Sequence, residues 1–185
     1  LLRQELTKAC QYYKKRGQIE PDFHYEAWVP VLEKKIPLKA HVHRVDDIFT
    51  AIRIAKEFDL CMTLDHCSEG HLIAEELAAE GFPAIVGPDL ASRNKIEVQN
   101  MAFKTAGVLA RAGVLVAITT DHPVSLIQSL PLCAGLSVKA GLSMQEGLRA
   151  ITINAARRTH KLALAGYEAA SKALLDVMAK EFLTH

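Results

Sequence analysis

The sequence has 185 residues, about the length of one domain. Hydrophobic residues make up 50% and charged residues 23%, a balance that supports a buried core and excludes a disordered chain. Lys and Arg number 22 against 21 Asp and Glu, and the resulting net charge of +1 excludes a broadly basic surface for nucleic acid or anionic membranes.

The first 35 residues are predicted to form helices. Residues 1–16 have an amphipathic pattern that ends at Gly17. The apolar positions of this pattern recur at helical spacing: Leu2, Leu6, Cys10 and Tyr13. A second helical segment is predicted over residues 25–35, with a break or sharp bend at Pro30 because proline cannot continue a helix.

Residues 36–160 are predicted to form four βα units. Short apolar runs alternate with helical patterns, which is typical of a parallel sheet with helical crossovers. The predicted strands cover residues 38–42, 61–65, 83–86 and 114–119. The predicted helices cover residues 46–58, 68–80, a short stretch ending at 112–113, 126–140 and 143–153. The predicted fold class is therefore α/β, with four parallel strands in chain order.

Local signals fix several boundaries of these units. Gly81 ends the second helix, and Ser143 with Glu146 fits the S-x-x-E capping box at a helix start. A last helix is predicted over residues 161–185. We expect residues 1–185 to form a single domain, with extra helices at both ends of the βα units.

Three predicted strands end in ionisable residues where apolar side chains would pack at lower cost. The candidates are His41, His66 and Asp121, each at the carboxyl end of a strand, where ligands collect in parallel α/β folds. Neutral His and Asp are good zinc ligands, so the pattern predicts a divalent metal site. His43 and His122 are interpreted as loop or supporting residues. Four more histidines are interpreted as solvated: His24, His71, His160 and His185.

Structural interpretations of the same residues stay open. A histidine at one strand end is more often a hydrogen-bonded structural residue, and Asp121 also fits the start of a turn before His-Pro. The polar loop after Gly87 fits a substrate lid in which Arg93 and Lys95 contact an anion. It fits an ordinary solvated loop equally well.

The cysteines and the apolar runs indicate in which cellular compartment the protein is expected. The four cysteines form no C-x-x-C pair and no disulfide-framework spacing: Cys10, Cys61, Cys67 and Cys133. Free, mostly buried thiols are typical of a reducing cytoplasm, so we expect a cytoplasmic protein. No apolar run approaches the roughly 20 residues that span a bilayer, so we expect no membrane partner.

Residues 36–158 resemble the C-terminal half of a metal-dependent amidohydrolase, close to imidazolonepropionase-like and prolidase-like members. The segments that carry this resemblance are PLKAHVHRVDDIFTAIRIAKEF, LDHCSEGHLIAEELAAEGFPAIVGP, AGVLVAITTDHP and EGLRAITINAARR. The resemblance implies strands five to eight of a TIM-like (β/α)₈ barrel. It also implies that His41 binds metal, that His66 binds metal or substrate, and that Asp121 binds metal and shuttles a proton.

The sequence departs from the family at both ends. No candidate appears for strands one to four, their H-x-H motif or the fourth-strand lysine. His41-Val42-His43 has the same H-x-H spacing, but only two predicted strands lie between it and the strand that ends at Asp121. If it were the first strand of the barrel, six strands would lie between them. An Ala-rich helix replaces the family's C-terminal β-rich subdomain. The chain thus resembles half a barrel, either a fragment of a longer product or a degenerate descendant.

The resemblance implies a hydrolase of C–N bonds in small amides or cyclic amides, with water activated by Zn, or by Fe or Mn. Asp121 and His66 would be catalytic, with His66 and Arg93 contacting substrate and His41, Asp121 and His66 holding the metal. The alternative is a catalytically inactive half-barrel that self-associates. In either case we expect a homo-oligomer, because a half-barrel leaves two strand edges unpaired.

Overall fold

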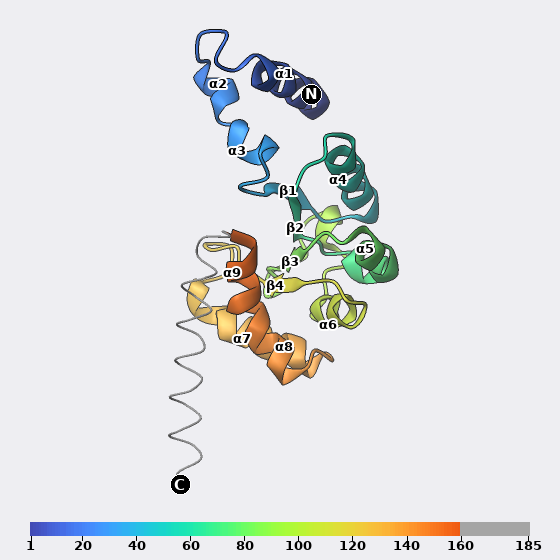
Figure 1. Ribbon diagram of the computed structural model, residues 1–185. Helices are drawn as coiled ribbons and strands as arrows, with labels where there is room; N and C mark the ends of the chain where they lie inside the picture. The colour runs from blue at the N-terminus through green and yellow to red at the C-terminus, as the bar shows by residue number, and fades with distance from the viewer. Residues whose placement is uncertain (160–185) are drawn as a thin grey trace.

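The computed structural model describes residues 1–159, so the predicted helix over residues 161–185 lies outside the described residues. The centre of the fold is one parallel sheet with the strand order β1-β2-β3-β4 (Figure 1). Its strands are β1 (Leu38–Val42), β2 (Met62–His66), β3 (Ala84–Val86) and β4 (Val116–Ile118). The prediction of an α/β fold with four parallel strands in chain order is confirmed.

Three helices pack on one face of the sheet: α4 (Val45–Glu57), α5 (Ala74–Glu80) and α6 (Lys104–Arg111) (Figure 1). Their apolar stripes meet the strands in one core, in which Ile48, Leu64 and Leu109 have no exposed surface. This burial is the main stabilising contribution of the crossover helices. Gly81 ends α5 in the left-handed conformation, as predicted.

The chain after β4 forms α7 (Leu130–Lys139), α8 (Met144–Ala150) and α9 (Ile153–Thr159). The buried Asn154 on α9 donates a hydrogen bond from Nδ2 to the Val116 carbonyl, 2.9 Å away, and so attaches α9 to β4. Ser143 caps α8 by accepting the Glu146 N–H at 3.1 Å, which confirms the predicted helix start.

Three predicted helices are shorter in the structure, one of them the stretch 143–153, which ends as α8 at Ala150 and is followed by the separate helix α9. The stretch 68–80 opens with a 3₁₀ turn, η1 (Gly70–Leu72), because the chain bends tightly over the buried Cys67. A Cβ at Gly70 would lie 2.6 Å from the Cys67 sulfur. The stretch 126–140 opens with η3 (Ile127–Ser129), and α7 begins only at Leu130, where Pro131 fits its first turn.

The N-terminal part is helical, with α1 (Leu2–Lys15), α2 (Phe23–Glu26) and α3 (Val29–Leu32). The segment predicted over residues 25–35 is wrong in detail: it forms two short helices, and Pro30 lies in the first turn of α3 rather than at the break, since proline fits the start of a helix. The predicted apolar face of α1 is only partly correct. The buried residues are Leu6, Ala9 and Tyr12, whereas Leu2 and Tyr13 are about 40% exposed. The face is rotated because the Tyr12 hydroxyl reaches the Glu26 carboxylate, 2.6 Å away.

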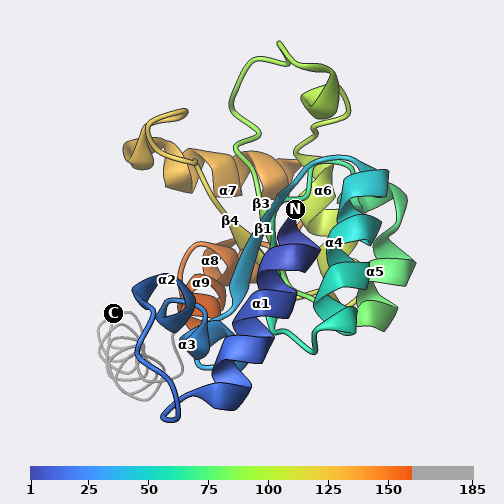
Figure 2. The ribbon, with the colours of Figure 1, turned by 90° about the horizontal axis from the view of Figure 1, so that it is seen from above.

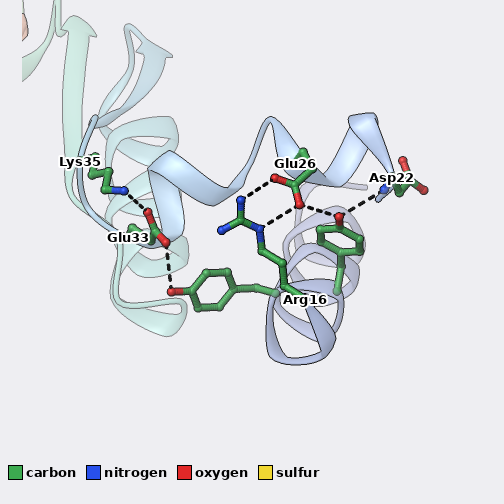
Figure 3. Close-up of polar contacts among 7 residues, drawn as sticks. Arg16, Asp22, Glu26, Glu33 and Lys35 are labelled. Atoms are coloured by element: carbon green, nitrogen blue, oxygen red, sulfur yellow. Dashed lines mark hydrogen bonds and ion pairs between the residues drawn. The ribbon is translucent and has the colours of Figure 1, made fainter. Parts of the chain in front are cut away.

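A polar network joins α1 to the two short helices (Figure 3). The Arg16 guanidinium donates two hydrogen bonds of 2.9 Å to the Glu26 carboxylate, and Glu33 accepts one from Tyr13 and pairs with Lys35. Arg16 and Tyr12 lower the pKa of Glu26. These contacts hold the N-terminal helices beside the β1 edge of the sheet (Figures 1 and 2).

All four cysteines are free, as predicted; Cys67 and Cys133 are buried and Cys61 is exposed. Among the described residues, none of the helices combines the length and the apolar character needed to cross a membrane. The division of residues 1–185 as a single domain stays a prediction.

Candidate metal centre

Three histidines meet at the carboxyl ends of β1 and β2. His41 lies on β1, His43 directly follows it, and His66 ends β2. Each offers a ring nitrogen, and the three nitrogens lie within 4.8 Å of one another. The three rings also contact each other, with centroids 4.2–4.8 Å apart. We call this group the histidine triad.

The strand register explains how the triad forms. Residues two apart on a strand project from the same face, which brings His41 and His43 together. His66 pairs with Val42 in the parallel register and therefore lies between them along the strand direction. The backbone of His66 leaves strand geometry, with a φ of +71°, at the point where its ring meets the other two rings.

The backbone is strained around this point. Only five non-glycine residues among those described have a positive φ, and His66, Cys67 and Asp121 are three of them. Left-handed backbone costs such residues roughly 1 kcal/mol or more each and is concentrated at functional sites. The strain thus coincides with the predicted site.

Hydrogen bonds orient two of the imidazoles. His66 Nδ1 lies 2.7 Å from the Gly87 carbonyl oxygen, which only accepts, so Nδ1 carries the proton and Nε2 keeps a free lone pair. His43 Nδ1 lies 2.8 Å from the Ser68 hydroxyl. His43 Nε2 is 3.1 Å from His41 Nε2. Two lone pairs this close repel, so a shared proton or a bound cation stabilises the pair.

Burial controls protonation near the triad. His43 is 8% exposed, and burial, with smaller effects from His66 and His41, lowers its pKa to about 4. The ring is therefore neutral at neutral pH, the form that binds metals. Burial raises the pKa of the adjacent Cys67 to about 12, and its sulfur is not among the ligand atoms that lie together at the triad.

The triad opens into a pocket of about 270 Å³ that Asp121 also lines. The structure thus brings together His41, His66 and Asp121, the three residues singled out in the sequence. Asp121 is exposed, and within residues 1–159 its carboxylate accepts no hydrogen bond. Asp121 also starts a turn, which was the alternative role predicted for it. The turn is closed by its backbone carbonyl, which accepts a hydrogen bond from the Val124 N–H at 2.8 Å, so the carboxylate stays available.

The loop after β3 forms the outer wall of this pocket. Apart from one 3₁₀ turn, η2 (Ile96–Val98), it is irregular, as predicted. Lys95 and Glu97 line the pocket and pair with each other at 3.6 Å. Arg93 does not line it. It lies in a neighbouring cleft with His71 and Lys104, so the structure does not bring this predicted substrate contact to the triad pocket.

The histidines left outside the predicted ligand set differ among themselves. His43 belongs to the triad, and its spacing of two from His41 was the signal for it. His71, predicted to be solvated, is partly buried with Nδ1 2.9 Å from the Thr105 hydroxyl, and burial lowers its pKa. His24 and His122 are exposed, and His160 and His185 lie outside the described residues.

The Ser68 hydroxyl is expected to set the orientation of His43. Ser68 is buried and contacts only one of the three imidazoles, so its loss frees a single ring. Ser68→Ala should weaken Zn²⁺ binding about 10-fold, the lower end of the range for groups that orient a ligand. Competition with a chromophoric chelator measures this change. Unchanged affinity would show that packing alone fixes His43.

Comparisons with known proteins support the fold. No protein-family model and no curated protein matches the chain. A crystal structure of an amidohydrolase from Thermotoga maritima MSB8 is similar to it, with a TM-score of 0.80 and 35% sequence identity over 84% of this chain. The matched region is 43% of that protein, so the chain spans less than half of its length. The chain has an amidohydrolase-like fold; the narrower resemblance to imidazolonepropionase-like and prolidase-like members stays a prediction.

Proposed function

We propose that this chain carries the metal site of a hydrolase that cleaves C–N bonds in small amides or cyclic amides. The observation that carries the proposal is the histidine triad, which shares a pocket with the free carboxylate of Asp121 on an amidohydrolase-like fold. Three imidazoles match the ligand number of a catalytic zinc site, which keeps one further position for water. Fe and Mn are alternative metals.

Two ligand sets follow from this site, and both contain His41 and His66. The family resemblance adds Asp121 as the third ligand, whereas the geometry adds His43. His43 is the better third ligand because its Nε2 is already grouped with the other ring nitrogens. This assignment leaves the Asp121 carboxylate free for proton transfer.

A divalent metal held by these residues would supply hydroxide at neutral pH, because it would lower the pKa of water to about 7. Asp121 accepts the proton that the attacking water loses and passes it to the leaving nitrogen. His66 acts as a ligand. A role in polarising the substrate carbonyl would need an N–H directed at the substrate, and its Nδ1 proton is already donated to Gly87.

Hydrolysis of a panel of amides and cyclic amides tests the proposal. The purified chain should lose its activity after dialysis against a chelator and recover it when Zn²⁺ is added. Activity that persists after chelation would refute a metal-dependent reaction. A zinc-loaded chain that hydrolyses no member of the panel would favour the non-catalytic alternative.

The alternative, a self-associating half-barrel, rests on the two outer strands of the sheet, whose outer edges pair with no strand in the described region. In the described region β1 and β4 are the outer strands, and Lys39 and His41 on β1 are exposed. We propose that two copies associate in either case. Light scattering should give at least twice the monomer mass of 20.3 kDa. A stable monomer would show that the N-terminal helices protect the β1 edge unaided.

The free thiols support a cytoplasmic setting.

A further inference from the structure

A second cleft adjoins the triad pocket on the other side of the β3–α6 loop. Its volume is about 320 Å³, and Met101 lines both cavities. Three basic side chains line the second cleft: His71, Arg93 and Lys104. The proposed hydrolase mechanism uses none of them.

Carboxylates compensate the positive charge of this cleft only in part. Within residues 1–159, neither Arg93 nor Lys104 forms an ion pair. The carboxylate of Glu69 is close by but does not line the cleft; it accepts hydrogen bonds from Asn100 Nδ2 at 2.7 Å and from the Val45 N–H at 2.9 Å. Asp89 interacts electrostatically with Arg93, and burial raises the pKa of Asp89 to about 7, so this carboxyl is only partly ionised at neutral pH.

Hydrogen-bond donors accompany the charge. Asn100 and Gln99 also line the cleft. When His71 accepts the Thr105 hydroxyl at Nδ1, its proton is on Nε2 and can be donated. The cleft further contains Lys104, the first residue of α6, a helix without a side-chain cap. The positive end of the helix dipole there adds to the attraction for an anion.

We propose that this cleft binds an oxyanion, a phosphate or carboxylate group, through Arg93 and Lys104. Arg93 offers a planar guanidinium that pairs with two oxygens of such a group, and Lys104 adds a second point charge. The site is separate from the triad and requires no metal. The sequence interpretation of Arg93 as an anion contact is thereby kept, but for a different cavity.

Calorimetric titration of the metal-free chain with inorganic phosphate tests this site. Arg93→Gln and Lys104→Gln should each weaken binding about tenfold, the value of one hydrogen bond between charged groups. Arg53→Gln is the matched control, because Arg53 is exposed on α4 and lines neither cavity. Lys95→Gln tests whether phosphate enters the triad pocket instead. Both control variants should bind phosphate as the original chain does.

Titration with methyl phosphate distinguishes free phosphate from a phosphate group attached to a larger molecule, which methyl phosphate imitates. Binding of either probe that is lost in Arg93→Gln supports the site. Equal binding by all four variants, or a loss confined to Lys95→Gln, would overturn it. Because the titration involves neither metal nor catalysis, its outcome is independent of the hydrolase proposal.

Discussion

Replacing Asp121 with asparagine is expected to lower kcat/KM for amide hydrolysis by a factor of about 10²–10⁴, the usual contribution of a general acid–base group. Asparagine keeps the size of the side chain but cannot accept the proton of the attacking water. The Asp121 carboxylate has no hydrogen-bond partner in the described region, so the substitution disturbs little else. Steady-state kinetics of the zinc-loaded variant measure the effect.

The control is His122→Asn, which changes the exposed neighbour in the same turn. It should leave kcat/KM unchanged. Zinc affinity separates the two roles discussed for Asp121. A variant that binds Zn²⁺ normally but hydrolyses slowly supports proton transfer. A variant that loses Zn²⁺ would instead make Asp121 a ligand, as the family resemblance implies.

Replacing Gly87 with alanine is expected to lower the free energy of unfolding by about 3 kcal/mol or more. Gly87 has a φ of +116°, a conformation that disfavours side chains, and a Cβ there would overlap the Thr119 carbonyl oxygen. The obstructing oxygen belongs to the backbone and the Cβ is fixed to it directly, so the strands β3 and β4 must move apart at their carboxyl ends. The Gly87 carbonyl that orients His66 would move with them.

Urea denaturation measures this loss, with Gly135→Ala as the control. Gly135 is exposed within α7, and a Cβ there meets no atom within 4 Å. Alanine at that helical position should raise stability by roughly 0.5–1 kcal/mol. Equal stability of Gly87→Ala and the original chain would contradict the close approach of the two strands.

The sheet was predictable because its pattern is strong. Residues 38–42 match β1 at both ends, since Leu38, Ala40 and Val42 alternate with polar residues as in a strand. The capping of α8 by Ser143 was likewise predictable from a local signal. The N-terminal helix shows the limit of such signals. Its length follows from periodicity, but its buried face depends on Tyr12 and Glu26, which are distant in sequence.

The site was predictable in part. The three strand-end residues line one pocket because the carboxyl ends of parallel strands lie on the same side of a sheet. Two assignments needed the structure. His43 forms a triad only because His66 joins it and His41 through a left-handed backbone conformation, which the sequence does not reveal. Lys95 and Arg93 face different cavities because an irregular loop has no periodicity from which orientation can be derived.

Zinc affinity of the histidine variants tests the central claim, that His41, His43 and His66 hold one divalent metal ion. Equilibrium competition should give about one Zn²⁺ per chain. His43→Ala should weaken binding by at least about 100-fold, since even the loss of a group that orients a ligand costs 10–100-fold. His24→Ala, which removes an exposed histidine paired with Glu5, should change nothing. Zinc bound by His43→Ala as tightly as by the original chain would contradict the triad.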